Sequence, residues 1–257
     1  MLPMLKSKAS LITIVLGFLL LLSCSLEALN IKEQMAYADY LYSRFLLERE
    51  ADFIKETYHY LQQCATIWPN SYEILWRLAR TLNEYGEEVE QPLIYWQEGL
   101  NLAEKAVSLE PQRAEGYLWL AILKGQIGRK KGILNSLSSA KQMKELLEIV
   151  LTLESQHAYA NYILSTLYRL VPGLPISFGN SKKALDYAKK AVELEPNSPF
   201  LLWNLYEASI SGGEKDKAKA ILEKIYLLPN YEPFAHLYNQ PFPAEIKKKA
   251  AIALSKY

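Results

Sequence analysis

The chain has 257 residues, of which 29 are Lys or Arg and 28 are Asp or Glu, and half are hydrophobic. A nearly neutral chain offers no electrostatic case for binding nucleic acid or an anionic membrane surface. The length is sufficient for one sizeable domain or for a solenoid.

The N-terminal segment has the three parts of a secretory signal. Lys6 and Lys8 make a short basic start, and an apolar run covers 11–22. As a helix this run would reach about 18 Å, which is shorter than the ~30 Å core of a bilayer. A cleaved signal is therefore favoured over an uncleaved membrane anchor.

The apolar run ends in Leu-Leu-Ser-Cys, which resembles a bacterial lipobox. The resemblance implies a signal peptide over 1–23, cleavage before Cys24 and lipid attachment to that cysteine. The mature domain, 24–257, would then be anchored to the cell membrane or the outer membrane and would face the periplasm or the exterior. Ser25 stands where Asp, in the best-known bacteria, would signal retention in the inner membrane. Ordinary cleavage nearer Ala28 is the alternative.

Beyond the signal, the chain has helical periodicity. Apolar residues recur at steps of three and four, as at Leu75, Leu78, Ala79 and Leu82, and no stretch alternates as a half-buried strand would. Pro and Gly fall between these runs, where they end helices. The pattern predicts an all-α chain of about 10–11 helices. We expect them at 31–47, 50–67, 71–85, 94–109, 112–127, 133–153, 157–170, 181–194, 198–211, 214–227 and 243–256.

Three segments, 60–86, 102–128 and 187–213, align without gaps and carry the same pair of helices. Each has a small residue in its first helix, a proline at the junction and a glycine near the end of its second helix. We expect the glycines to close helices in a left-handed conformation. The small residues are Cys64, Ala106 and Ala191, the prolines are Pro69, Pro111 and Pro196, and the glycines are Gly86, Gly128 and Gly213. Because Cys64 takes the place of Ala, we expect a buried, inert thiol.

The pattern Ala-x-x-Leu-x-Pro, at 106–111 and 191–196, resembles the tetratricopeptide repeat (TPR). The resemblance implies a TPR-like solenoid of helical hairpins with a concave face. The junction prolines lie 42 residues apart between 69 and 111 and 33 apart between 196 and 229, whereas the usual period is ~34. The array is therefore TPR-like, with extra residues in its first half.

Two narrower resemblances concern the same chain. WRLARTL at 76–82, GLNLAEKAVSLEP at 99–111 and ILKGQIGRKKGI at 122–133 are similar to the regulator-of-microtubule-dynamics type of TPR protein. As an exported helical lipoprotein, the chain also looks like the T-component lipoproteins of TRAP-type periplasmic transporters. The second resemblance implies an accessory role in solute uptake.

By the TPR resemblance, the first helix of each hairpin lines the concave groove. Asn, Arg and Lys side chains there can hold a partner's main chain or carboxylate, and aromatic residues and Arg concentrate binding energy. At any single position, a solvated side chain is the alternative. The groove candidates are Arg77, Arg80, Tyr117, Lys124, Asn161, Tyr162, Arg169, Asn204 and Glu207.

Two further segments differ in composition from the repeats. The connection 171–181 has two prolines and two glycines, and we expect Phe178 to pack down as a plug, with a partner contact as the alternative. The segment 243–256 is amphipathic, with Ile246 and Ala250 on its apolar face. It predicts a helix that caps the array.

The sequence lacks the common motifs of catalysis and metal binding. His59, His157 and His236 lie far apart, and there is no HExxH, CxxC, GxSxG or phosphate-binding Gly-rich loop. An acidic group, Glu84, Glu87, Glu88 and Glu90, is expected to be a solvated insertion, with a weak site for calcium or for a cationic partner as the alternative. We therefore expect neither an enzyme nor a metal or cofactor site.

Together these patterns predict an exported, lipid-anchored scaffold that binds a protein partner in the cell envelope and contacts the membrane through lipid on Cys24. The alternative is an accessory, T-component-like lipoprotein of a periplasmic solute-uptake system.

Overall fold

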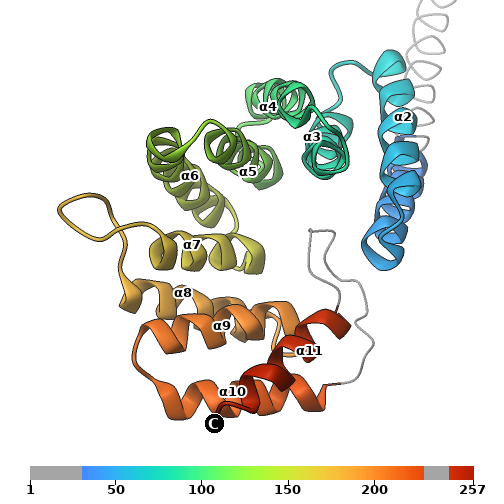
Figure 1. Ribbon diagram of the computed structural model, residues 1–257. Helices are drawn as coiled ribbons and strands as arrows, with labels where there is room; N and C mark the ends of the chain where they lie inside the picture. Colours follow the sequence, from blue (N-terminus) through green and yellow to red (C-terminus); the bar gives the residue numbers. More distant parts are fainter. Residues whose placement is uncertain (1–30, 229–242) are drawn as a thin grey trace, which may run out of the picture. The chain divides into compact units, whose positions relative to one another are not determined.

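The computed structural model describes residues 31–228 and 243–257, and every regular element in these ranges is a helix (Figure 1). The predicted signal peptide and Cys24 lie outside the described residues. The chain divides into two compact units, Met1–Tyr40 and Leu41–Tyr257. The domain boundary before Cys24 therefore stays a prediction. In the described ranges, no helix has the length and apolar character that crossing a bilayer requires.

The predicted all-α class and order of helices are confirmed. A first helix covers 31–48, and each described helix begins and ends within three residues of its expected bounds. Polar residues begin some of them: the Asn180 side chain accepts a hydrogen bond from the Lys183 N–H at 2.9 Å. The other helices are α2 (Ala51–Ile67), α3 (Tyr72–Glu87), α4 (Pro92–Leu109), α5 (Ala114–Lys130), α6 (Ile133–Leu153), α7 (Ala158–Leu170), α8 (Ser181–Leu194), α9 (Pro199–Ser211), α10 (Lys215–Leu227) and α11 (Pro243–Leu254).

Within the larger unit, consecutive helices pair into hairpins that stack on one another (Figure 1). In each hairpin the two helices pack together: α3 with α4, α5 with α6, α7 with α8, and α9 with α10. The outer junctions between hairpins each use two pairs of helices: α3 and α4 both contact α5, and α7 and α8 both contact α9. Between the two middle hairpins the contact runs through α6 and α7. This is the helical-hairpin solenoid that the TPR resemblance implies.

Small residues allow the close approach of helices in this stack. Ala106 of α4 and Ala191 of α8 have no exposed surface, and Cys64 of α2, at the same repeat position, is 4% exposed. Burial raises the pKa of the Cys64 thiol, which keeps it protonated and unreactive. The predicted buried cysteine is confirmed.

The glycines near the helix ends have two different roles. Gly213 has a φ of +80°, so the left-handed cap predicted there is confirmed. Gly86 and Gly128 instead lie inside α3 and α5, and the prediction of left-handed caps is wrong for both. A Cβ on Gly86 would lie 2.2 Å from Nε1 of Trp96, and one on Gly128 would lie 2.1 Å from Oγ of Ser139. These two positions are glycine because the second helix of the hairpin packs directly on them.

The last helix, α11, covers the end of the array as predicted. It packs against α10 and α9. Its apolar face is buried, with Ile246 at 1% and Ala250 at 0% exposure, whereas Ile252 on another face is 53% exposed. The helix therefore shields apolar surface that the last hairpin would otherwise present to solvent.

Candidate functional site

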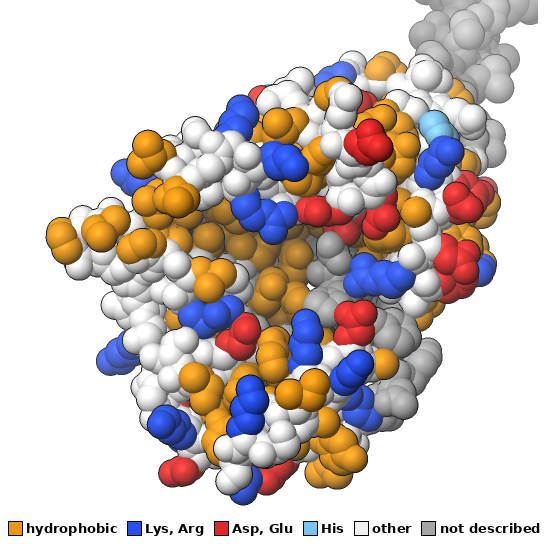
Figure 2. All heavy atoms as spheres, viewed as in Figure 1, with side chains coloured by type: hydrophobic (Ala, Val, Ile, Leu, Met, Phe, Trp, Pro, Cys, Tyr) orange, Lys and Arg blue, Asp and Glu red, His pale blue; other side chains and the backbone are white. Residues whose placement is uncertain are grey.

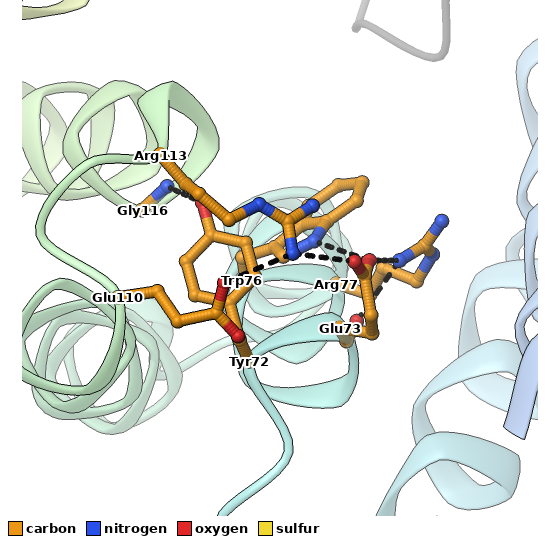
Figure 3. A network of polar contacts seen from close by, with 7 residues as sticks. All are labelled: Tyr72, Glu73, Trp76, Arg77, Glu110, Arg113 and Gly116. Carbon is orange, nitrogen blue, oxygen red and sulfur yellow. Dashed lines mark hydrogen bonds and ion pairs between the residues drawn. The ribbon is translucent and has the colours of Figure 1, made fainter. Parts of the chain in front are cut away.

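The first candidate region is a polar network on the first turn of α3 (Figure 3). The Glu73 carboxylate accepts hydrogen bonds from Nε1 of Trp76 at 3.1 Å and from the guanidinium of Arg77, and it pairs with Nη1 of Arg113 at 2.7 Å. The Tyr72 hydroxyl accepts the N–H of Gly116 at 3.0 Å. Arg77, a predicted groove residue, is thus engaged in a network that joins α3 to the start of α5.

The electrostatics of this network favour a charged Glu73. Burial by itself raises the pKa of this carboxyl, but hydrogen bonds from Arg113 and Arg77 outweigh burial and hold the pKa below its ordinary value. The Arg113 guanidinium also lies over the Tyr72 ring, 4.1 Å from its centroid. These contacts indicate a structural junction between two repeats.

Arg80, one turn further along α3, is buried. It is 1% exposed, and its guanidinium carbon lies 3.9 Å from the centroid of the Tyr42 ring and 5.1 Å from that of Trp76. A cation held between aromatic rings stabilises packing and presents little charge to an incoming partner.

Glu84 follows on the same helix and is also buried, at 2% exposure. Burial raises the pKa of this carboxyl to about 7, although the Asn83 amide donates a hydrogen bond to it at 2.7 Å. The prediction that Glu84 belongs to a solvated insertion is wrong. Its neighbours in sequence, Glu87, Glu88 and Glu90, do lie at the end of α3 and in the following turn, so the acidic run crosses from core to surface.

The candidates on α5 lie apart from the others. Tyr117 is half-buried and packs against the main hydrophobic core. Lys124 points toward α4, where its Nζ lies 3.9 Å from the Glu104 carboxylate. Neither side chain joins a larger polar cluster among the described residues.

The remaining five candidates lie on α7 and α9, which pack together, and all but Asn161 make contacts between the two helices. Nη2 of Arg169 pairs with the Glu207 carboxylate at 2.8 Å, and the Asn204 amide donates to Oγ1 of Thr166 at 3.2 Å. The Tyr162 ring packs on Phe200 of α9, with centroids 4.4 Å apart. We call this surface the α7–α9 polar face. It consists of Asn161, Tyr162, Ser165, Thr166, Arg169, Asn204 and Glu207.

Three oxygens on the α7–α9 polar face have unused hydrogen-bonding capacity. Oδ1 of Asn161, Oγ of Ser165 and Oδ1 of Asn204 are buried and have no hydrogen-bond partner in the described part of the chain. A buried polar atom left unpaired costs about 1–3 kcal/mol. Ser165 and Thr166 were not among the predicted residues, but Ser165 lies one turn after Asn161 and one before Arg169, a spacing that the sequence displays.

A pocket of about 360 Å³ lies beside the turn between α3 and α4. It is lined by charges of both signs, including Glu87, Glu90 and Lys130, and Arg129 pairs with Glu87 across it at 3.1 Å. Because Arg129 and Glu87 already neutralise each other, the pocket carries no distinct ligand chemistry. Elsewhere in 31–228 and 243–257, no group of three or more His, Cys, Asp or Glu side chains is placed to hold a metal ion.

Stacked helical hairpins with polar residues on their first helices define a TPR-like helical scaffold. A solved thermophilic TPR protein from Thermus thermophilus has this fold: it superposes with a TM-score of 0.67 at 18% identity, over 87% of this chain and 98% of that one. The model of the family described as regulator of microtubule dynamics protein 1-3 matches residues 34–175, which is more than half of the chain. The chain belongs to that family. The resemblance to the tetratricopeptide repeat and the resemblance to the regulator-of-microtubule-dynamics type are therefore confirmed.

Two curated relatives carry the family's name. Regulator of microtubule dynamics protein 3 of Xenopus laevis is 29% identical over 113 residues, which are 43% of this chain and 24% of that protein. The protein of the same name from Bos taurus is 30% identical over 95 residues, which are 36% of this chain and 20% of that protein. The chain thus matches about a quarter or less of the length of these relatives.

Proposed function

We propose that this protein is a scaffold that binds a protein partner through the α7–α9 polar face. The observation that carries the proposal is the set of buried oxygens on Asn161, Ser165 and Asn204 that lack a partner in the described residues. A segment of protein main chain offers N–H donors that suit amide and hydroxyl oxygens. Because these oxygens are covered in the isolated chain, the side chains over them must shift when such a segment binds, and binding would then supply the hydrogen bonds that the isolated chain leaves unmade.

The neighbouring side chains support a partner of this kind. Tyr162, Arg169 and Glu207 are partly exposed, so the same surface offers an aromatic ring and both signs of charge at its border. Aromatic residues and Arg are enriched in protein interfaces, and polar groups line the solvent-accessible rim.

The test is the double variant Asn161→Ala with Asn204→Ala. We expect it to fold and to co-purify about tenfold less of a directly bound partner, because two hydrogen bonds of roughly 0.5–1.5 kcal/mol each are lost. Asn101→Ala on α4, away from this face, is the matched control. Equal recovery of the partner by the double variant and the control would remove the face from the proposal.

The proposal extends to location: an exported protein tethered to the cell envelope through lipid on Cys24. It is supported by the basic start, the apolar run 11–22 and the lipobox-like ending, all of them features of the sequence. Mass spectrometry of the mature N-terminal peptide tests this directly. A diacylglyceryl-cysteine at position 24 is expected, and an unmodified N-terminus near Ala28 would contradict it.

The accessory role in periplasmic solute uptake stays an alternative prediction, because no contact in the described ranges favours a small solute over a protein segment. The absence of an enzymatic activity likewise stays a prediction. The helical scaffold gives it general support, since such families are typically non-enzymatic.

A further inference from the structure

One edge of the array, where the middle helices begin and end, presents large apolar side chains to solvent. Leu174 is 88% exposed and Ile176 is 71% exposed, both in the connection between α7 and α8. Ile133 and Leu134, which begin α6, are 81% and 84% exposed, and Leu170, at the end of α7, is 66% exposed. We call these five residues the apolar edge. Figure 2 shows hydrophobic side chains gathered over these elements, at the tip of the projecting connection and above it.

The connectivity places these residues at the same edge of the stack. The helix α6 begins where α5 ends, and α7, which packs with α6, runs back alongside it after a short turn. The first residues of α6 and the last residues of α7 therefore share one end (Figure 1). A cluster of this kind differs from a scattered exposed leucine, which needs no explanation.

The projecting connection is held in place by its own contacts. The Gly179 N–H donates to the Pro172 carbonyl at 2.9 Å, and the Asn180 N–H donates to the Tyr168 carbonyl at 2.7 Å. Phe178 packs edge-on against Tyr168, with ring centroids 5.3 Å apart, so the predicted plug is confirmed. With Phe178 turned inward, the connection holds its aliphatic residues outward.

The charge around the apolar edge is strongly positive. The segment 129–144 contains five Lys or Arg residues and the segment 170–185 contains two, and neither contains Asp or Glu. Lys130, Lys131 and Lys182 are exposed. Acidic groups pair with two of the basic residues: Glu87 of α3 with Arg129, and Glu148, one turn further along α6, with Lys144.

We propose that the apolar edge docks on an anionic lipid surface. Projecting aliphatic side chains can enter the soft boundary between headgroups and acyl chains, whereas a protein partner would need a matching pocket for each. Lysines beside them suit the negative headgroups. The nearly neutral overall charge of the chain does not oppose this, because basic residues act on a surface within about 10 Å of it.

The proposal goes beyond the scaffold function and does not depend on lipid at Cys24. A lipid anchor would bring the chain to a membrane, whereas the apolar edge determines which face of the array touches it. The two are separable, so the experiment uses the full chain with Cys24→Ser.

An environment-sensitive fluorophore placed on Ile176→Cys reports whether the edge enters a bilayer, since Cys64 is buried and does not react. The matched control is the same fluorophore on Ile67→Cys, at the opposite edge of the stack where α2 ends, since Ile67 is 65% exposed. Vesicles of phosphatidylcholine with phosphatidylglycerol are compared with vesicles of phosphatidylcholine alone, and co-sedimentation measures how much protein is bound.

We expect the emission from position 176 to shift to the blue with anionic vesicles and the emission from position 67 to stay unchanged. High salt, or the double variant Lys130→Glu with Lys131→Glu, should weaken the apparent affinity for anionic vesicles about tenfold. No shift at position 176 on protein that co-sediments would overturn the proposal and leave the Cys24 anchor standing. An equal shift at both positions, or a shift without vesicles that grows with protein concentration, would overturn it in favour of non-specific adsorption or of a second copy of the chain.

Discussion

Glu84 shows how one residue of α3 can make the fold sensitive to pH. Its carboxyl is buried beside Asn83 and in the field of Arg80 and Arg49, and burial raises its pKa from 4.5 to about 7. Below about pH 4.5 the folded and unfolded chains both hold this proton. As pH rises from there toward 7, the unfolded chain releases the proton and the folded chain retains it, so stability falls across this window.

We therefore predict that Glu84→Gln removes a loss of roughly 2–3 kcal/mol between about pH 5 and about pH 8. The amide keeps the size and one acceptor of the protonated acid without its titration. Urea unfolding at both pH values gives the measurement, with Glu88→Gln at the exposed end of α3 as the matched control. A wild-type stability that does not change between the two pH values would contradict the prediction.

At the scale of the elements, the hairpin of α3 and α4 depends on the missing side chain of Gly86. Trp96 is 3% exposed, and its Nε1 donates to the Asn83 carbonyl at 3.1 Å, which fixes the indole directly over the glycine. A methyl group there would collide with a ring that the core holds in place.

We predict that Gly86→Ala destabilises the fold by about 1–3 kcal/mol, the usual cost of overpacking, despite the better helix propensity of Ala. Combining it with Trp96→Leu should cost less than the sum of the two single changes, because the smaller side chain makes room. Thermal unfolding of the four proteins measures this, and strict additivity would argue against the collision as the cause.

The sequence predicted the helices closely because Pro, Gly and polar caps mark their ends and because apolar spacing marks their length. It could not tell a glycine that caps a helix from one that admits a neighbouring side chain, since both occur near helix ends. The candidate site was predicted in part. Arg80 and Glu84 resemble surface residues along one helix, and only the packing of other helices on α3 reveals that they are buried.

At the scale of the whole molecule, the end of the array depends on α11. Ile246 is 1% exposed in the main hydrophobic core, and Ile252 on the same helix is 53% exposed. Both residues are isoleucines of α11, so a comparison of the two positions isolates the contribution of burial.

We predict that Ile246→Ala lowers the free energy of unfolding by about 2–5 kcal/mol and that Ile252→Ala changes it by less than about 0.5 kcal/mol. Calorimetric or denaturant unfolding of the full chain measures both. Similar small losses at the two positions would mean that α11 is not part of the cooperative core.

The contact between α6 and α7 that joins the middle hairpins has a consequence for cooperativity. In a chain of nearest-neighbour units, a junction that uses fewer helices than its neighbours separates units that can open at different free energies. We predict that, under native conditions, the amide hydrogens of 72–153 share one free energy of exchange and those of 158–227 share another. A single exchange free energy across both ranges would show that the α6–α7 junction transmits unfolding as well as any other. Two groups would give the array a natural point of articulation, at which its halves could adjust to partners of different size.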